Sequence, residues 1–115
     1  MYRCLFCEFV NGQTPCTKSY EDENISSFID WNHLDGVHIV LYPKKHIGLK
    51  DRDTEEFKSL RKMLYEAVPK AAEYENLSDD YRTLFEDDEK SVGQDVEHLH
   101  IHLTGKVKEN GGTES

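Results

Sequence analysis

Three histidines near the C-terminus alternate with apolar residues in the segment His98-Leu99-His100-Ile101-His102-Leu103. Alternation at a period of two is typical of a β-strand, in which residues i, i+2 and i+4 point to the same side. We therefore expect a strand over residues 96–104, with three imidazoles in a row on one face. Imidazole suits nucleophilic attack, proton transfer and metal binding near neutral pH. A solvated face or a purification tag is the simpler explanation, but a tag is contiguous and terminal.

A second candidate site is the pair Cys4 and Cys7, which are separated by two residues. A tight turn there would place both thiolates on one side, as in half of a tetrahedral zinc site. The same spacing occurs in redox motifs, where a strand precedes it and a helix follows. Only three residues precede Cys4 in this chain. The other metal ligands would have to come from elsewhere, and the chain has histidines to supply them.

Composition limits the class of protein. The chain has 115 residues, with 14 Lys and Arg against 23 Asp and Glu and a formal net charge of −9. That length fits one domain, and the acidic balance argues against a binder of nucleic acid polymers or anionic membranes. We see no apolar run that could span a bilayer and no signal peptide at the start, so we expect a soluble cytoplasmic protein. Three cysteines, an odd number, do not suggest a disulfide framework.

The elements that must position these residues can be outlined from pattern alone. A helix is expected to start with Asp53 as its N-cap, to keep an apolar stripe from Phe57 to Tyr74, and to be kinked or interrupted by Pro69 near Val68. Alternation and β-branched or aromatic residues predict the strands. They are residues 17–21, 25–31, 37–42 and 81–85, in addition to the histidine strand. Residues 1–105 are expected to form the domain and residues 106–115 a polar tail.

Several upstream landmarks accompany the histidine segment. They are Cys4-Leu5-Phe6-Cys7, Tyr20-Glu21-Asp22, Phe28-Ile29-Asp30, His38, Pro43-Lys44-Lys45-His46 and Gly93-Gln94. Together they resemble the signature of the histidine-triad (HIT) superfamily, Hint branch, and the likeness covers nearly the whole chain from Cys4 to Gly105. The resemblance implies an α+β fold with an antiparallel sheet of about five strands and one main helix. It also implies a homodimer in which the two sheets join.

The resemblance further implies a reaction. Most members are hydrolases of nucleoside phosphoramidates or phosphates, or nucleotidyl transferases. On the matching positions, His100 would attack the α-phosphorus of a purine nucleotide or nucleoside phosphoramidate and form a nucleotidyl-histidine, while His102 and His38 would orient it and hold its tautomer. Asp30 would accept hydrogen bonds from the ribose, and Gln94 would donate to the phosphate. The nucleoside would lie against Leu5, Phe6, Phe9, Phe28 and Trp31, although Leu5, Phe9 and Trp31 fit equally well as core residues.

Members with an N-terminal Cys-x-x-Cys bind zinc. Carried over to this chain, the ligands are Cys4, Cys7, His46 and His98. Two thiolates and two imidazoles make a closed tetrahedral site, which is structural and not catalytic. The alternative is two buried thiols and two hydrogen-bonded histidines.

Two departures from the family pattern bear on activity. This chain has Gly93-Gln94-Asp95 where many members have Ser or Thr third, and Asp87-Asp88-Glu89 where Asn-Glu-Gly is common. A carboxylate ~4 Å from an anionic phosphate costs on the order of 4 kcal/mol in an intermediate dielectric. Micromolar binding amounts to about 8 kcal/mol in total. The alternatives are therefore a non-catalytic HIT-like dimeric binding or scaffold protein, and an enzyme in which Asp95 acts as a general acid.

Overall fold

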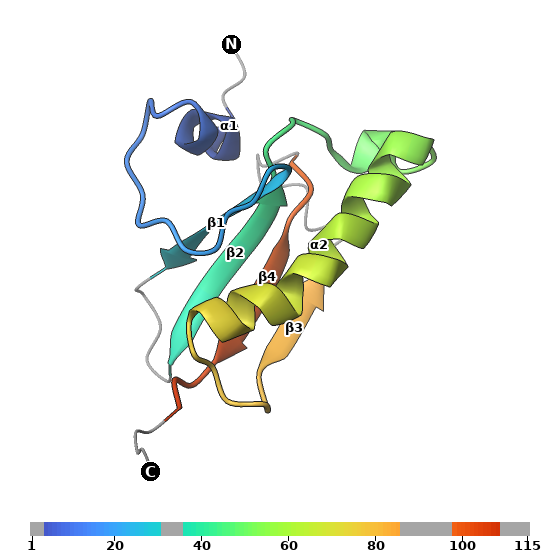
Figure 1. Ribbon diagram of the computed structural model, residues 1–115. Helices are drawn as coiled ribbons and strands as arrows, with labels where there is room; N and C mark the ends of the chain where they lie inside the picture. The colour runs from blue at the N-terminus through green and yellow to red at the C-terminus, as the bar shows by residue number, and fades with distance from the viewer. Residues whose placement is uncertain (1–3, 31–35, 86–97, 109–115) are drawn as a thin grey trace.

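The computed structural model of the chain describes residues 4–30, 36–85 and 98–108. Four strands form one antiparallel sheet in the order β1-β2-β4-β3, and α2 is the main helix (Figure 1). The predicted α+β class is confirmed, with four strands among the described residues where about five were expected. The elements are α1 (Leu5–Val10), β1 (Ile25–Asp30), β2 (Val37–Pro43), the 3₁₀ turn η1 (Leu49–Asp51), α2 (Glu55–Tyr74), β3 (Arg82–Phe85) and β4 (Ile101–Gly105).

Side-chain alternation separates the two faces of the sheet. On β2, Ile39 and Leu41 belong to the larger core, whereas Val40 packs in a smaller cluster on the opposite side. α2 lies across the first face (Figure 1) and adds Phe57, Leu64, Ala67, Val68, Ala71 and Ala72 to the larger core. Burying one such large aliphatic or aromatic side chain contributes about 1.5–3 kcal/mol. Since Ile101 and Leu103 of β4 also point into this core, His102 between them is left on the face away from α2.

The helix differs from its prediction at two positions. Thr54, not Asp53, is the N-cap, because its hydroxyl accepts a hydrogen bond from the backbone N–H of Phe57 at 3.1 Å. Pro69 does not interrupt α2, which continues to Tyr74. Proline removes one backbone donor, whose partner in a regular helix would be the carbonyl of Tyr65. Both Pro69 and Tyr65 are exposed, so the lost hydrogen bond lies on the solvent side of α2.

Two predictions near the N-terminus were wrong. The expected turn at Cys4 and Cys7 is instead the start of α1, with Cys4 as its N-cap and Cys7 inside it. The expected strand over residues 17–21 is reduced to an isolated bridge between Lys18 and Phe28. The segment nevertheless covers the outer edge of β1, because the N–H of Ser19 donates to the Ser27 carbonyl.

The histidine strand begins later than predicted. β4 starts at Ile101, and residues 98–100 precede it. The backbone of residues 98–100 is held from outside the sheet, because the N–H of Leu99 donates to the carbonyl of Ile47 at 2.6 Å. Beyond the other end of β4, the carbonyl of Lys106 accepts from the N–H of Ser78, so the first residues of the expected tail are tied to the loop after α2.

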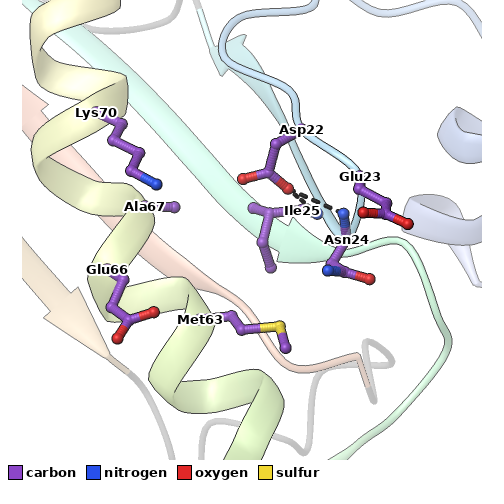
Figure 2. Close-up of a pocket in the computed structure, with 8 residues that line it drawn as sticks. All are labelled: Asp22, Glu23, Asn24, Ile25, Met63, Glu66, Ala67 and Lys70. Atoms are coloured by element: carbon purple, nitrogen blue, oxygen red, sulfur yellow. Dashed lines mark hydrogen bonds between the residues drawn. The ribbon is translucent and has the colours of Figure 1, made fainter.

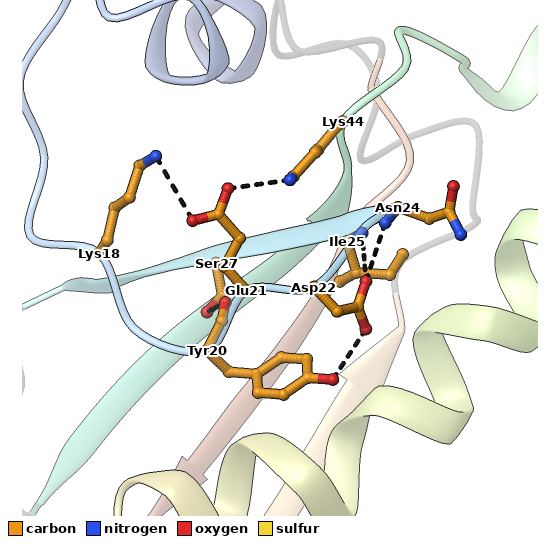
Figure 3. A network of polar contacts seen from close by, with 8 residues as sticks. All are labelled: Lys18, Tyr20, Glu21, Asp22, Asn24, Ile25, Ser27 and Lys44. Carbon is orange, nitrogen blue, oxygen red and sulfur yellow. Dashed lines mark hydrogen bonds and ion pairs between the residues drawn. The ribbon is translucent and has the colours of Figure 1, made fainter.

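Asp22 organises the loop that leads into β1 (Figure 3). Its carboxylate accepts hydrogen bonds from the Tyr20 hydroxyl and from the backbone N–H groups of Asn24 and Ile25, at 2.8–2.9 Å. Burial alone would raise the pKa of Asp22, but these hydrogen bonds, with Lys70 nearby, lower it below its ordinary value. Lys70 extends from α2 toward Asp22 across a cavity of about 310 Å³ (Figure 2). This cavity lies on the α2 side of the sheet, away from the histidines.

None of the helices among the described residues combines the length and apolar character needed to cross a membrane.

Replacing Asp22 by Ala should destabilise the fold in a pH-dependent way. The folded-state pKa of this carboxyl is depressed, so its contribution is present above the unfolded pKa near 4 and disappears as the pH falls below it. We expect a loss of about 1–2 kcal/mol in the free energy of unfolding at pH 7 and a smaller loss at pH 3, measured by urea denaturation. Glu23→Ala, at the exposed neighbouring position, is the control. An equal loss at both pH values would contradict this account.

Candidate active site and metal centre

Four predicted ligands, distant in sequence, meet at one end of the sheet. They are Cys4 and Cys7 from α1, His46 after β2, and His98 before β4. One ligand atom from each lies within 4.8 Å of all the others. The Cys4 Sγ is 3.2 Å from the His98 Nδ1, and the Cys7 Sγ is 3.2 Å from the His46 Nδ1 and 3.8 Å from the His98 Nδ1. The sequence predicted this set, and the structure brings it together.

Hydrogen bonding leaves His98 ready to act as a ligand. The His98 Nε2 lies 2.7 Å from the carbonyl oxygen of Pro43, which can only accept, so Nε2 carries the proton and Nδ1 presents its lone pair to the cysteines. His98 is 2% exposed, and burial lowers its pKa to about 4, so the ring is neutral at pH 7. This second hydrogen bond of a ligating imidazole is the arrangement common to metal sites.

The two thiols match the same interpretation. Burial, followed by the adjacent Cys4, raises the pKa of Cys7 to about 11. A thiol next to a second thiol resists ionisation unless a cation neutralises both, which metal binding does with release of protons. In a tetrahedral zinc site the ligand atoms lie about 3.3–3.9 Å apart, since Zn–S is about 2.3 Å and Zn–N about 2.0–2.1 Å. The observed separations fit such an ion after small side-chain adjustments.

His100 is held in one tautomer by the backbone. Its Nδ1 lies 2.7 Å from the carbonyl oxygen of His98, so Nδ1 donates and Nε2 carries the lone pair. The ring is half-buried and 5.3 Å, between centroids, from Phe6. A neutral imidazole with a fixed donor on one nitrogen is a competent nucleophile at the other. The hydrogen bond that fixes this tautomer is donated to the backbone carbonyl two positions earlier. That His102 and His38 also help to hold it stays a prediction.

His102 and His38 form a pair beside His100. The His38 Nε2 is 2.9 Å from the His102 Nδ1, and the two rings stack at 5.0 Å. His102 meets His100 edge-on, with ring centroids 5.1 Å apart. The pairing of β2 with β4 sets His38 opposite Thr104. Thr104 is two residues after His102 in β4 and therefore points to the same face as His102. Gly36 permits this approach: its φ is +142°, and a Cβ there would lie 2.4 Å from the Gly105 carbonyl oxygen.

The predicted nucleoside-binding residues divide into three groups. Phe6 and Phe9 are 6% and 7% exposed and pack in the smaller core with Val40 and Tyr42. Phe28 is half-buried and packs against them, so it retains surface for a ligand. Trp31 and Gln94 lie outside the described residues, as do the side chains of Leu5 and Asp30. Asp87 and Asp95, the two departures from the family pattern, also lie outside them. The nucleoside contacts stay predictions.

Sequence reasoning missed one part of this face. A cavity of about 380 Å³ lies beside the histidine pair, lined by His38, Arg82, Thr83, Leu84, His102 and Thr104. Arg82 and Leu84 belong to β3, which we predicted only as a strand. Strand alternation within residues 81–85 would have placed Arg82 and Leu84 on one face, but which face depends on pairing with β4.

Comparison with known proteins identifies the family. The family described as "Scavenger mRNA decapping enzyme C-term binding" matches residues 3–115. Protein hit of Bacillus subtilis is 34% identical over 114 residues, which cover 95% of this chain and 74% of that protein. The 14 kDa zinc-binding protein of Zea mays is 33% identical over 104 residues, covering 88% of this chain and 80% of that protein.

A solved structure agrees in both fold and sequence. The HIT family hydrolase from Legionella pneumophila superposes with a TM-score of 0.76 and 34% identity, over 92% of this chain and 95% of that chain. The family match, over residues 3–115, spans both the cysteine pair and the three alternating histidines of this chain. The chain is therefore a member of the histidine-triad (HIT) family.

Proposed function

We propose that the chain is a nucleotide-binding hydrolase or nucleotidyl transferase that works through His100. The observation that carries this proposal is the hydrogen bond from the His100 Nδ1 to the His98 carbonyl, which makes Nε2 the nitrogen that carries the lone pair of the neutral imidazole. The Legionella pneumophila relative, named as a hydrolase, supports the same class of reaction.

In the proposed reaction, the His100 Nε2 attacks the α-phosphorus of a nucleoside phosphoramidate or related nucleotide. A nitrogen–phosphorus bond forms as the bond from phosphorus to the leaving nitrogen or oxygen breaks, and the leaving group takes up a proton. Water then attacks the phosphorus of the nucleotidyl-histidine. This releases a nucleoside monophosphate, gives up a proton and restores the imidazole. His102 and His38, which are hydrogen-bonded to each other, orient the ring of His100.

The nucleoside is proposed to lie on the β1 side of the histidines. Phe28 offers a half-buried aromatic surface there, and Asp30 pairs in register with His38 on the neighbouring strand. Asp30 is assigned to the ribose hydroxyls and Gln94 to the phosphate, with Leu5 and Trp31 completing the nucleoside contacts. Phe6 and Phe9 act by supporting Phe28, because they are themselves buried.

A second candidate function is a non-catalytic, dimeric binding or scaffold protein of the same fold. It is favoured by Asp87 and Asp95, acidic residues that stand where the family pattern has neutral donors. This candidate keeps the metal centre and the dimer but not turnover, so one assay separates the two functions.

We also propose that zinc occupies the Cys4, Cys7, His46 and His98 cluster. The name of the maize relative, a zinc-binding protein, supports this choice of metal. The ion would be structural, because four protein ligands leave no open position for substrate. It would tie α1 to the approach of β4, and so hold His98 and the carbonyl that orients His100.

A homodimer joined through β3 is the assembly we propose. β3 is an edge strand, and among the described residues nothing pairs with its outer side, whereas the outer side of β1 is covered. An open edge presents unpaired backbone groups that a second copy can satisfy. Leu84 on β3 is 56% exposed. Two antiparallel β3 strands would make one continuous sheet.

Replacing His100 by Ala should remove turnover of adenosine and guanosine phosphoramidates, lowering kcat by at least about 10³-fold because the nucleophile is gone. His100→Asn should be equally inactive, although its amide can still donate to the His98 carbonyl. Lys62→Ala, on the exposed side of α2, should keep the parent rate. A parent protein inactive on every nucleotide phosphoramidate and dinucleotide polyphosphate would instead support the scaffold function.

Elemental analysis of the purified protein should find about one zinc ion per chain. Cys4→Ser should lose the metal and melt at a lower temperature, whereas Cys16→Ser, which alters the cysteine outside the cluster, should retain it. A chelator should lower the melting temperature of the parent, since binding energy of this kind is also folding energy. A metal-free parent whose melting temperature does not respond to chelator would remove the assignment.

Sedimentation equilibrium should give a mass about twice the 13.4 kDa of one chain. If two β3 strands pair across a two-fold axis, Thr83→Cys should form an intermolecular disulfide under mild oxidation, because facing residues near the axis are about 5 Å apart. Lys62→Cys on α2 should not. A monomer at micromolar concentration would rule out this assembly.

A further inference from the structure

The face that carries the histidines continues beyond them onto β3. There the cavity of about 380 Å³ has the histidine pair on one side and Arg82 and Leu84 on the other. The proposed reaction uses the histidines but gives no role to this cavity.

The strand pairing fixes the order of side chains across this face. One row of directly paired residues runs Phe28, Val40, His102 and Leu84, from β1 to β3. The next row runs Asp30, His38, Thr104 and Arg82. Paired residues in antiparallel strands point to the same side, so Arg82 lies on the histidine face, across β4 from His38. Neighbouring strands are about 4.8 Å apart, which an extended arginine can span.

The charge of Arg82 is available to a ligand. Arg82 is exposed, and no carboxylate among the described residues lies within ion-pair distance of it. Among the described residues that line the cavity, it is also the one lysine or arginine. A guanidinium stays protonated at all physiological pH values and offers a planar fork of donors that matches carboxylate or phosphate. Thr104, paired with Arg82, also lines the cavity and has a hydroxyl that can donate beside it.

We propose that this cavity receives the leaving group of the substrate and that Arg82 binds an anionic group on it. The inference rests on the proposed function. If the nucleoside lies toward β1 and the phosphorus is attacked from β4, the cavity on the β3 side of the face gives the departing group room to extend. The chain would then prefer substrates whose leaving group carries a carboxylate or phosphate a few bonds from the α-phosphorus. Arg82 is a specificity-determining residue on this account.

The proposed dimer is compatible with this role. Pairing of two β3 edges uses backbone N–H and carbonyl groups that lie in the plane of the sheet. Arg82 and Leu84 project from the face of the sheet, so their side chains remain free to line the cavity.

The test compares substrates that differ only in the leaving group. Adenosine 5′-phosphoramidates of alanine and of alaninamide have the same phosphorus–nitrogen bond, but only the first carries a carboxylate. Adenosine 5′-diphosphate supplies the phosphate arm. We expect Arg82→Ala to lower the kcat/KM ratio of alanine to alaninamide substrate about tenfold, mainly through KM, because the charge-assisted hydrogen bonds to the carboxylate are lost. Arg82→Lys should give an intermediate ratio, and Lys62→Ala should leave it at the parent value.

These substrates distinguish a carboxylate from a phosphate as the group that Arg82 binds. They also separate failure of the Arg82 proposal from failure of the proposed function. A loss confined to the alanine substrate identifies a carboxylate, and one confined to the diphosphate identifies a phosphate; either supports the proposal. The proposal is overturned, and the proposed function left intact, if Arg82→Ala changes neither the kcat/KM of the alanine substrate nor that of the diphosphate, each taken relative to the alaninamide substrate. If the parent turns over nothing, the proposed function fails. Arg82 is then tested by binding, where Arg82→Ala should narrow the affinity ratio of adenosine 5′-diphosphate to monophosphate about tenfold, and an unchanged ratio overturns the inference.

Discussion

Contacts made by three polar atoms of His98, its two ring nitrogens and its backbone carbonyl oxygen, hold the site together. Its Nε2 donates to the Pro43 carbonyl at the end of β2, its Nδ1 faces the two cysteines, and its own carbonyl accepts from the His100 Nδ1. The same residue therefore belongs to the candidate metal cluster through its ring and positions the candidate nucleophile through its backbone. Burial keeps the ring neutral, because charging it there would cost the solvation that water otherwise provides. Any change that moves His98 disturbs both centres together.

Strand alternation keeps stability and chemistry on separate faces. Ile101 and Leu103 are fully buried under α2, and the residues that alternate with them are the histidines. The α2 face can therefore be packed to native density while the opposite face retains polar side chains with surface exposed. On that opposite face, the buried aromatic cluster at α1 and β1 gives way to histidines on β4 and then to Arg82 on β3. The order suits a substrate that is apolar at one end and anionic at the other.

Charge distribution matters more here than net charge. The chain carries a formal charge of −9, which opposes binding of an anionic nucleotide anywhere on its surface. Local donors must overcome that field. Among the described residues beside the histidine pair, Arg82 is the group that carries a permanent positive charge. Thr104, its partner on β4, can add a hydrogen bond.

The sequence by itself determined the chemistry-bearing residues and the fold class. The period of two around His98, His100 and His102 predicts side chains facing one way, because alternation is a local property of extended backbone. Tertiary structure decided what local patterns do not contain. Loop geometry places the His98 carbonyl against His100, a tertiary hydrogen bond from Leu99 to Ile47 accompanies the late start of β4, and the pairing of β3 with β4 turns Arg82 toward the histidines. A strand's register fixes which of its two faces meets the core, and only its partner strand sets that register.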